Sequence, residues 1–217
     1  FIANLTSKDI ASSVALTVNE KHGIWYNPMT GKYHEAIIGD KGIQLNLKSG
    51  ESRILITSNK PVNEWNLGSK VKVGGKESIA AADSKIIDLT ANTWKLSFTE
   101  DAPKVGETFN LKGVKSWEGL SEKAKVMMGT GVYETTIKLS KDDAKKQWAI
   151  DLGDVRESAR VYINNKYVGC AWAVPYILNC KDALNKGKNT IRIEVTNLPA
   201  NRIAEMDRQG VKWRKMK

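Results

Sequence analysis

The sequence predicts an all-β protein, an antiparallel β-sandwich with an additional N-terminal β segment. Apolar residues recur at every second position along most of the chain, which is typical of strands that bury one face. Gly, Asn, Asp and Pro separate these runs at the spacing of a sandwich. The best helix signal, residues 140–146, is one polar turn after Ser140 and predicts a loop turn.

The N-terminal β segment covers residues 1–66. Alternating apolar and polar residues predict strands at 13–18, 43–47 and 53–57. Turns are expected at 27–31 and 48–51, because Pro fixes one backbone dihedral and Gly permits a positive φ. Residues 67–90 lose the alternation and are interpreted as a connector.

The second set of strands occupies residues 91–217 and begins with Trp94, which alternates in phase with Leu96 and Phe98. Asn164 and Asn165 predict a tight hairpin, because Asn tolerates the left-handed region that a type I′ turn requires. Trp94 and Trp148 are expected in the core. The further predicted strands are 132–139, 148–152, 159–163, 167–170 and 190–196.

Composition excludes several classes of protein. The 217 residues are 41% hydrophobic and 27% charged, and no run approaches the roughly 18 apolar residues that a membrane span needs. The net charge of +10 is spread over alternating strand positions such as Lys95, Lys138, Arg160 and Arg192, a pattern typical of a solvated sheet face. Without a basic block or a recognised motif, we expect no nucleic-acid partner. The chain begins at Phe1 without a start methionine or a signal peptide, which suggests a processed piece of a longer protein.

The residues that could carry chemistry are few. Cys170 and Cys180 lack zinc-site spacing and are expected to be free buried thiols, with one disulfide as the alternative. His22 and His34 lie beside no nucleophile motif, so we expect no metal site and no histidine-based hydrolase. A pair of carboxylates for glycoside chemistry could be drawn from one group of acidic residues, whose separation the sequence leaves open. They are Glu118, Glu134, Asp151, Asp154, Glu157 and Asp207.

Three aromatic residues fall outside the alternating pattern. Trp117 lies in a loop region, and Trp172 and Tyr176 flank Pro175 in a segment without alternation. Exposed aromatic rings can stack on the apolar faces of sugars, so these three residues are candidate sugar-binding platforms. The alternative is that they close the end of the sandwich as ordinary packing.

Residues 148–169 (WAIDLGDVRESARVYINNKYVG) and 184–197 (LNKGKNTIRIEVTN) resemble the galactose-binding-like jelly roll that serves as the sugar-binding domain of family 2 glycoside hydrolases. Residues 1–6, 27–31, 47–51, 197–203 and 207–213 are similar to the C-terminal part of family 106 glycoside hydrolases, the α-L-rhamnosidase family. The resemblance implies that a preceding barrel carries the catalytic residues, so none is assigned in this chain. It also implies an exported protein, periplasmic or on the cell surface.

The tail residues Asn201, Arg202, Asp207 and Arg208 match the family 106 pattern. The resemblance implies that they hydrogen-bond a sugar or, as we prefer, dock the catalytic domain of the parent enzyme. Calcium is common in such jelly rolls but no D-x-D-x-D-G string marks a site, so no cofactor is assigned and calcium stays open.

We therefore expect a non-catalytic accessory β region of a polysaccharide-degrading, rhamnosidase-like glycoside hydrolase. An autonomous carbohydrate-binding module and a complete small glycosidase are the alternatives.

Overall fold

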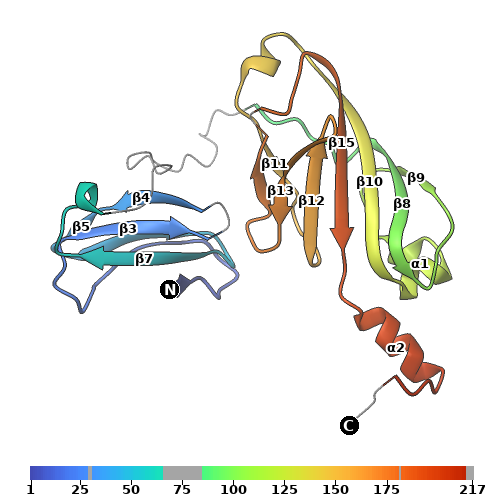
Figure 1. Ribbon diagram of the computed structural model, residues 1–217, viewed down its shortest axis with the longest axis horizontal. Helices are drawn as coiled ribbons and strands as arrows, with labels where there is room; N and C mark the ends of the chain where they lie inside the picture. Colours follow the sequence, from blue (N-terminus) through green and yellow to red (C-terminus); the bar gives the residue numbers. More distant parts are fainter. Residues whose placement is uncertain (29–30, 66–84, 181, 214–217) are drawn as a thin grey trace. The chain divides into compact units, whose positions relative to one another are not determined.

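The computed structural model describes residues 1–28, 31–65, 85–180 and 182–213. The chain divides into two compact units, Phe1–Ile86 and Ile87–Lys217. Both units consist mainly of antiparallel strands, which confirms the predicted fold class (Figure 1). Most of the predicted connector, 67–90, lies outside the described residues, so its boundaries stay a prediction.

Unit 1 is a small sandwich of two sheets. A four-stranded sheet has the order β1-β7-β3-β4, and a three-stranded sheet has the order β2-β6-β5. Buried side chains from both sheets form one core, among them Trp25, Ile43 and Leu45. The elements are β1 (Ile2–Ala3), β2 (Ile10–Val14), β3 (His22–Asn27), β4 (Lys32–Ala36), β5 (Ile38–Gly39), β6 (Gly42–Leu47), β7 (Ser52–Ser58) and the 3-10 helix η1 (Val62–Glu64).

The predicted strands of unit 1 are confirmed in part. Strands β6 and β7 lie where the alternation places them. The strand expected at 13–18 is instead β2 and ends at Val14, which pairs with Ile43. The pairing ends there because Gly42, the next residue on the partner strand, is the first residue of β6, has a φ of 92° and follows the turn from β5.

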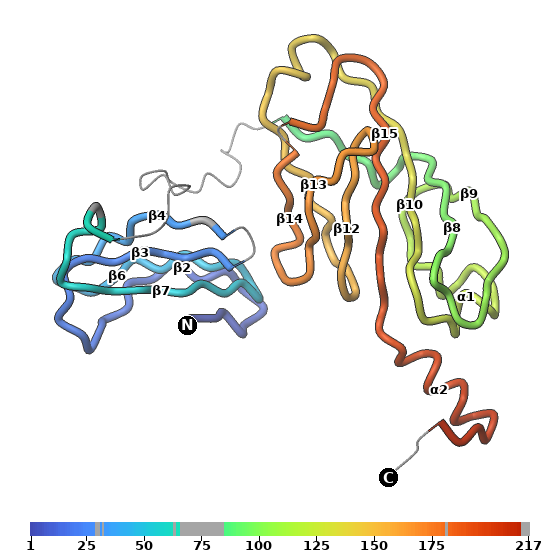
Figure 2. The backbone as a smooth tube through the Cα atoms, in the orientation of Figure 1, coloured from blue at the N-terminus to red at the C-terminus, as the bar shows by residue number. Residues whose placement is uncertain are grey.

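Unit 2 is built on a six-stranded antiparallel sheet with the order β13-β12-β15-β10-β8-β9, beside a two-stranded sheet of β11 and β14. Figure 2 shows β12, β15 and β10 side by side. The strands are β8 (Thr93–Ala102), β9 (Phe109–Lys112), β10 (Met128–Leu139), β11 (Ala149–Asp151), β12 (Ser158–Ile163), β13 (Lys166–Ala171), β14 (Ile177–Asn179) and β15 (Gly187–Thr196). The helices are the 3-10 turns η2 (Trp117–Gly119) and η3 (Asp143–Lys145), and the α-helices α1 (Glu122–Val126) and α2 (Ala200–Arg208).

The core of unit 2 lies on the inner face of the six-stranded sheet. Leu96, Val161 and Ile191 are at most 2% exposed, and Ile150 and Leu178 of the two-stranded sheet pack against the same cluster. Trp94 is buried, as expected, and Trp148 packs at the edge of the core. The alternation therefore identifies the buried face of this sheet correctly.

The hairpin between β12 and β13 is formed as expected. Asn164 and Asn165 have φ values of 52° and 63°, the left-handed region that a type I′ turn needs. The Asn164 amide also donates to the Ala183 carbonyl at 2.9 Å and to Oδ1 of the fully buried Asn189 at 2.8 Å. The hairpin is therefore tied to the loop that precedes β15.

Two further elements were weak or absent in the sequence pattern. Residues 140–146 contain the single turn η3, and its Asp143 N–H donates to the Ser140 hydroxyl at 3.0 Å. Helix α2 was not predicted.

Cys170 and Cys180 are free thiols, half-buried and buried respectively. Within the described residues, no helix is long and apolar enough to cross a membrane.

Candidate functional site

Trp117 is a core residue that positions the exposed residue after it. Its indole is 7% exposed and packs edge-on against Phe98, with ring centroids 5.9 Å apart, and beside Tyr133. The prediction of a sugar-stacking face is therefore wrong for Trp117, because its ring is buried and the packing alternative describes it. Its burial fixes η2, so Glu118 points outward.

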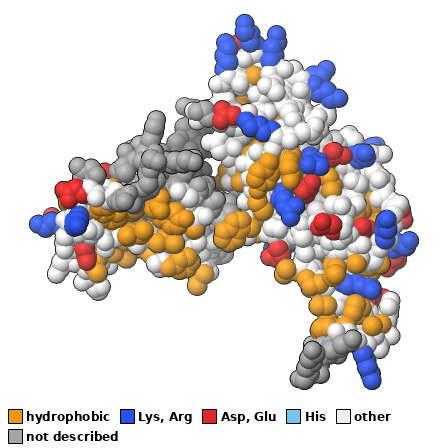
Figure 3. Space-filling view, viewed as in Figure 1, with side chains coloured by type: hydrophobic (Ala, Val, Ile, Leu, Met, Phe, Trp, Pro, Cys, Tyr) orange, Lys and Arg blue, Asp and Glu red, His pale blue; other side chains and the backbone are white. Residues whose placement is uncertain are grey.

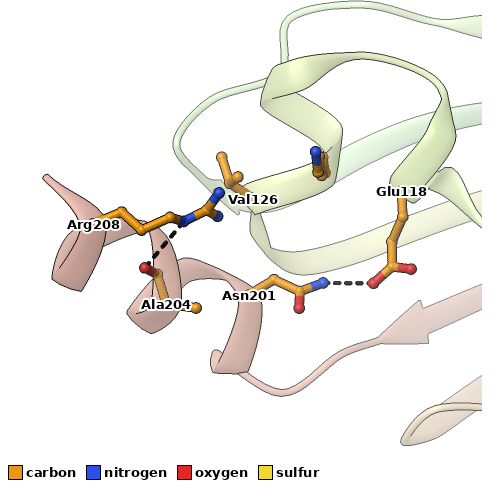
Figure 4. Close-up of a pocket in the computed structure, with 6 residues that line it drawn as sticks. Glu118, Val126, Asn201, Ala204 and Arg208 are labelled. Atoms are coloured by element: carbon orange, nitrogen blue, oxygen red, sulfur yellow. Dashed lines mark hydrogen bonds between the residues drawn. The ribbon is translucent and has the colours of Figure 1, made fainter.

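Glu118 forms a hydrogen bond with the C-terminal helix α2. The Asn201 Nδ2 of α2 donates to Glu118 Oε1 at 2.6 Å, and α2 also contacts α1 and β10. Beside this bond lies a shallow depression of about 190 Å³ (Figure 4). It is lined by Glu118, Lys125, Val126, Asn201, Ala204 and Arg208.

The charges around this depression are mixed. Arg208 lies along α2, where its guanidinium meets the Glu205 carboxylate at 2.8 Å and its Nε donates to the Ala204 carbonyl. Asp207 accepts from the Trp213 indole N–H. Glu118 is the one carboxylate among the described residues that line the depression, whereas glycoside hydrolysis uses a pair of carboxyl groups. The arrangement fits a polar contact surface.

Helix α2 leaves apolar surface exposed around it. None of the nine residues of α2, all of them described, is buried. Just before and after the helix, Leu198 and Val211 are 57% and 46% exposed. Ile203 and Met206 of the helix are half-buried. An apolar surface rimmed by charged groups is typical of a protein contact.

The other predicted aromatic residues lie on a separate part of unit 2, between β13 and β14. Trp172 is 57% exposed and Tyr176 is half-buried. The Leu152 N–H donates to the Tyr176 carbonyl at 2.9 Å, so the 172–176 segment lies beside the loop that follows β11. In that loop Arg156 donates to both carboxylate oxygens of Asp154, at 2.9 and 2.8 Å.

Titration of these side chains follows from their surroundings. Burial raises the pKa of Tyr176, and the negative charges of Glu157 and Asp154 raise it further. The paired Arg156 guanidinium lowers the pKa of Asp154 through its hydrogen bonds. The exposed Trp172 indole can hold a sugar by stacking.

The predicted residues thus fall into two groups. Asn201 and Arg208 line the depression together with Glu118, while Arg202 is half-buried and Asp207 is exposed on the same helix. Lys125 and Val126 were not predicted. Their available signal was Ser121, which caps α1 by accepting from the Ala124 N–H at 3.2 Å. Among the described residues, no group of three or more His, Cys, Asp and Glu side chains could hold a metal ion.

Comparison with known proteins places part of the chain. Residues 120–217 match the model of the family described as glycosyl hydrolase 2 galactose-binding domain-like. This part of the chain is therefore similar to the galactose-binding-like domain of glycoside hydrolases. The match covers α1, η3, all strands from β10 to β15, and α2. Family 106 is not confirmed by these comparisons.

Two longer proteins are similar over most of the chain. A Formosa agariphila protein named "Putative beta-glucuronidase" is 29% identical over 177 residues, 75% of this chain and 15% of that protein. The structure of a rhamnosidase from Novosphingobium sp. PP1Y covers 97% of this chain and 19% of its own, with a TM-score of 0.67 and 22% identity. The likeness to the rhamnosidase shows a shared fold. The chain spans less than a fifth of either protein.

Proposed function

We propose that this chain is a non-catalytic accessory β region of a rhamnosidase-like glycoside hydrolase. Its galactose-binding-like domain docks onto the catalytic part of a longer polypeptide, exported to the periplasm or the cell surface. The observation that carries the proposal is α2, which the Glu118–Asn201 hydrogen bond holds on unit 2 while leaving its flanking apolar side chains exposed. The family match over 120–217 and the much longer relatives support it.

The docking surface can be tested with the catalytic part of the parent enzyme produced as a separate protein. The two proteins should bind each other in calorimetry. Leu198→Asp and Val211→Asp should each weaken the affinity by about tenfold or more, because a charge would be buried in an apolar contact. Leu5→Asp is the matched control, since Leu5 is 92% exposed on unit 1.

The non-catalytic role has its own test. The purified chain should not hydrolyse aryl rhamnosides or aryl glucuronides. Hydrolysis that disappears with Glu118→Gln or Asp207→Asn would show a complete small enzyme and reject the proposal.

The exposure of Trp172 favours a second candidate function, an autonomous carbohydrate-binding module. In that case rhamnose-containing oligosaccharides should bind saturably, and Trp172→Ala should weaken binding by about fivefold or more. Phe1→Ala, which removes another exposed aromatic ring, is the control. No heat signal at millimolar sugar would reject this second candidate.

A further inference from the structure

The outer face of the six-stranded sheet gathers basic side chains that are far apart in the sequence. The register of neighbouring strands places these residues on the face opposite the core, because Leu96, Tyr133, Val161 and Ile193 occupy the inward positions between them. Along the described strands the outward basic residues are Lys95, Lys112, Lys138, Arg160, Lys188 and Arg192, and the outward acidic residues at the regularly paired positions are Glu134 and Glu194. Figure 3 shows blue basic groups beside an orange patch on this face.

An aromatic and guanidinium cluster lies at one side of this face. The Arg192 guanidinium lies 4.2 Å from the centre of the Tyr162 ring. Tyr167 of the neighbouring strand packs against Tyr162 with ring centroids 5.4 Å apart, yet remains 55% exposed. Part of the Tyr167 ring is therefore open to a ligand.

Glu194 forms ion pairs with the two arginines of this cluster. Its carboxylate is 15% exposed and lies 3.3 Å from Arg192 and 3.9 Å from Arg160. The Arg160 side chain is nevertheless 60% exposed. A guanidinium carries five N–H donors, so the exposed Arg160 side chain can offer N–H groups to an anion.

A second, independent observation points to an anion. Lys138 of β10 and Lys188 of β15 are directly opposite each other in the register, and both are exposed. Like charges at directly opposed positions, about 5 Å apart at Cβ, destabilise a sheet. Their neighbours toward the sheet centre are Thr136 and Thr190, also opposite each other, which supply hydroxyl groups. A bound anion would neutralise the lysine pair.

We propose that this face binds an acidic polysaccharide. Its anionic groups pair with Arg160 and with the opposed Lys138 and Lys188, and one sugar ring stacks on Tyr167. Strands β13 and β10 are three strand spacings apart, or roughly 14 Å, so the ligand is an oligomer. The anionic group is a uronate carboxylate or a sulfate ester, which share this chemistry.

The test uses the full chain and four defined polymers in calorimetry or affinity electrophoresis. Polygalacturonate carries carboxylates, dextran sulfate carries sulfates, neutral dextran carries no charge, and polyglutamate is a polyanion without sugar rings. The chain should bind one or both acidic polysaccharides more tightly than the other two polymers. Preference between the two identifies the anionic group. Binding should weaken as salt rises, because the charges are exposed.

Variants locate the site. Arg160→Ala, the double variant Lys138→Ala with Lys188→Ala, and Tyr167→Ala should each weaken binding by about fivefold to tenfold. Lys123→Ala removes a positive charge from α1, outside the sheet, and should leave binding unchanged. Leu198→Asp should also leave it unchanged, since this proposal does not rest on docking through α2.

Four outcomes would overturn the proposal. They are no saturable binding to either acidic polysaccharide, equal binding to polyglutamate, equal binding to neutral dextran, and an equal loss in Lys123→Ala. Arg160→Lys separates folding from recognition, because it keeps the charge and the fold. It should lose part of the affinity while its unfolding curve matches that of the parent chain.

Discussion

Two buried titratable side chains, Tyr133 and Cys180, make the stability of unit 2 depend on pH in the alkaline range. Burial raises the pKa of Tyr133 from 10.0 to about 12 and the pKa of Cys180 from 9.0 to about 11. At a pH between the ordinary and the raised pKa of each group, the group is deprotonated in the unfolded chain and still protonated in the folded chain. The free energy of unfolding therefore falls as pH rises through this window, and the full contribution is present below about pH 9.

We expect a loss on the order of 2 to 3 kcal/mol for each group across its window. Urea unfolding between pH 8 and 11.5, followed by tryptophan fluorescence, measures it. Tyr133→Phe should flatten the upper part of the profile and Cys180→Ala the lower part. A flat profile in the parent chain would contradict the assignment.

The buried Trp117 ring leaves no room for a side chain at position 131, which is glycine. A Cβ added at Gly131 would lie 2.5 Å from Cζ3 and 2.8 Å from Cε3 of the indole. Gly131→Ala should lower the free energy of unfolding by about 1 to 3 kcal/mol, because the ring must shift inside a packed core. Gly119→Ala adds a methyl group where nothing lies within 4 Å and should change it by less than about 0.5 kcal/mol. Chemical denaturation of the two variants in parallel compares these values.

Among the elements, the hairpin between β12 and β13 has two asparagines with different roles. Asn165 matters for its backbone conformation and Asn164 for its side-chain hydrogen bonds. Asn165 has a φ of 63°, which glycine adopts without a steric cost. Asn165→Gly should therefore be neutral or stabilise by up to about 1 kcal/mol. Asn164→Gly should destabilise by about 1 to 3 kcal/mol, because it removes the bonds to Ala183, Asn189 and Thr190. Thermal melts that rank the two variants in the opposite order would contradict this assignment.

Helix α2 should open more readily than the strands of unit 2. It has no side-chain hydrogen bond at its N-cap, Pro199, and no buried residue. Asn201→Ala removes the bond to Glu118 and should speed amide exchange within residues 203–208 by about fivefold, while β15 keeps its protection. Hydrogen exchange read by mass spectrometry measures both segments. Arg202→Ala, on the same helix, is the control and should change the exchange less.

The strands could be predicted from sequence because alternation and burial coincide in them. The buried residues of β15, Ile191 and Ile193, alternate with polar residues in the sequence and are therefore identified by the pattern. Helix α2 could not be predicted in the same way, because its apolar residues are few and Pro199 offers no capping side chain. Trp117 was misplaced for a related reason, since a loop position says nothing about the ring pocket that Phe98 and Tyr133 form from distant strands.

At the scale of the whole molecule, each unit has its own core, so stability should respond unit by unit. Ile43 lies in the core of unit 1 and Ile191 in that of unit 2. Ile43→Ala and Ile191→Ala should each cost about 2 to 5 kcal/mol. Hydrogen exchange under mild denaturant should show lost protection confined to the mutated unit. Equal loss in both units would show one cooperative molecule.

The functional surfaces could be predicted less completely than the cores. Asn201 and Arg208 were found through a resemblance, and the structure places Glu118, a candidate carboxylate in the sequence, and the unpredicted Lys125 beside them. The basic residues of the outer sheet face were visible in the sequence as scattered charges. Their meeting depends on the strand order β13-β12-β15-β10-β8, which alternation does not encode.

The half-buried Cys170 lies directly opposite Arg160 in the register of β12 and β13. The other thiol, Cys180, is 3% exposed, so a maleimide dye should react with the native chain at Cys170 first. The molecule thereby carries a natural attachment point for a fluorophore next to Arg160 and on the same strand as Tyr167. Quenching or a spectral change of that dye would report arriving glycan in real time, without engineering a new cysteine.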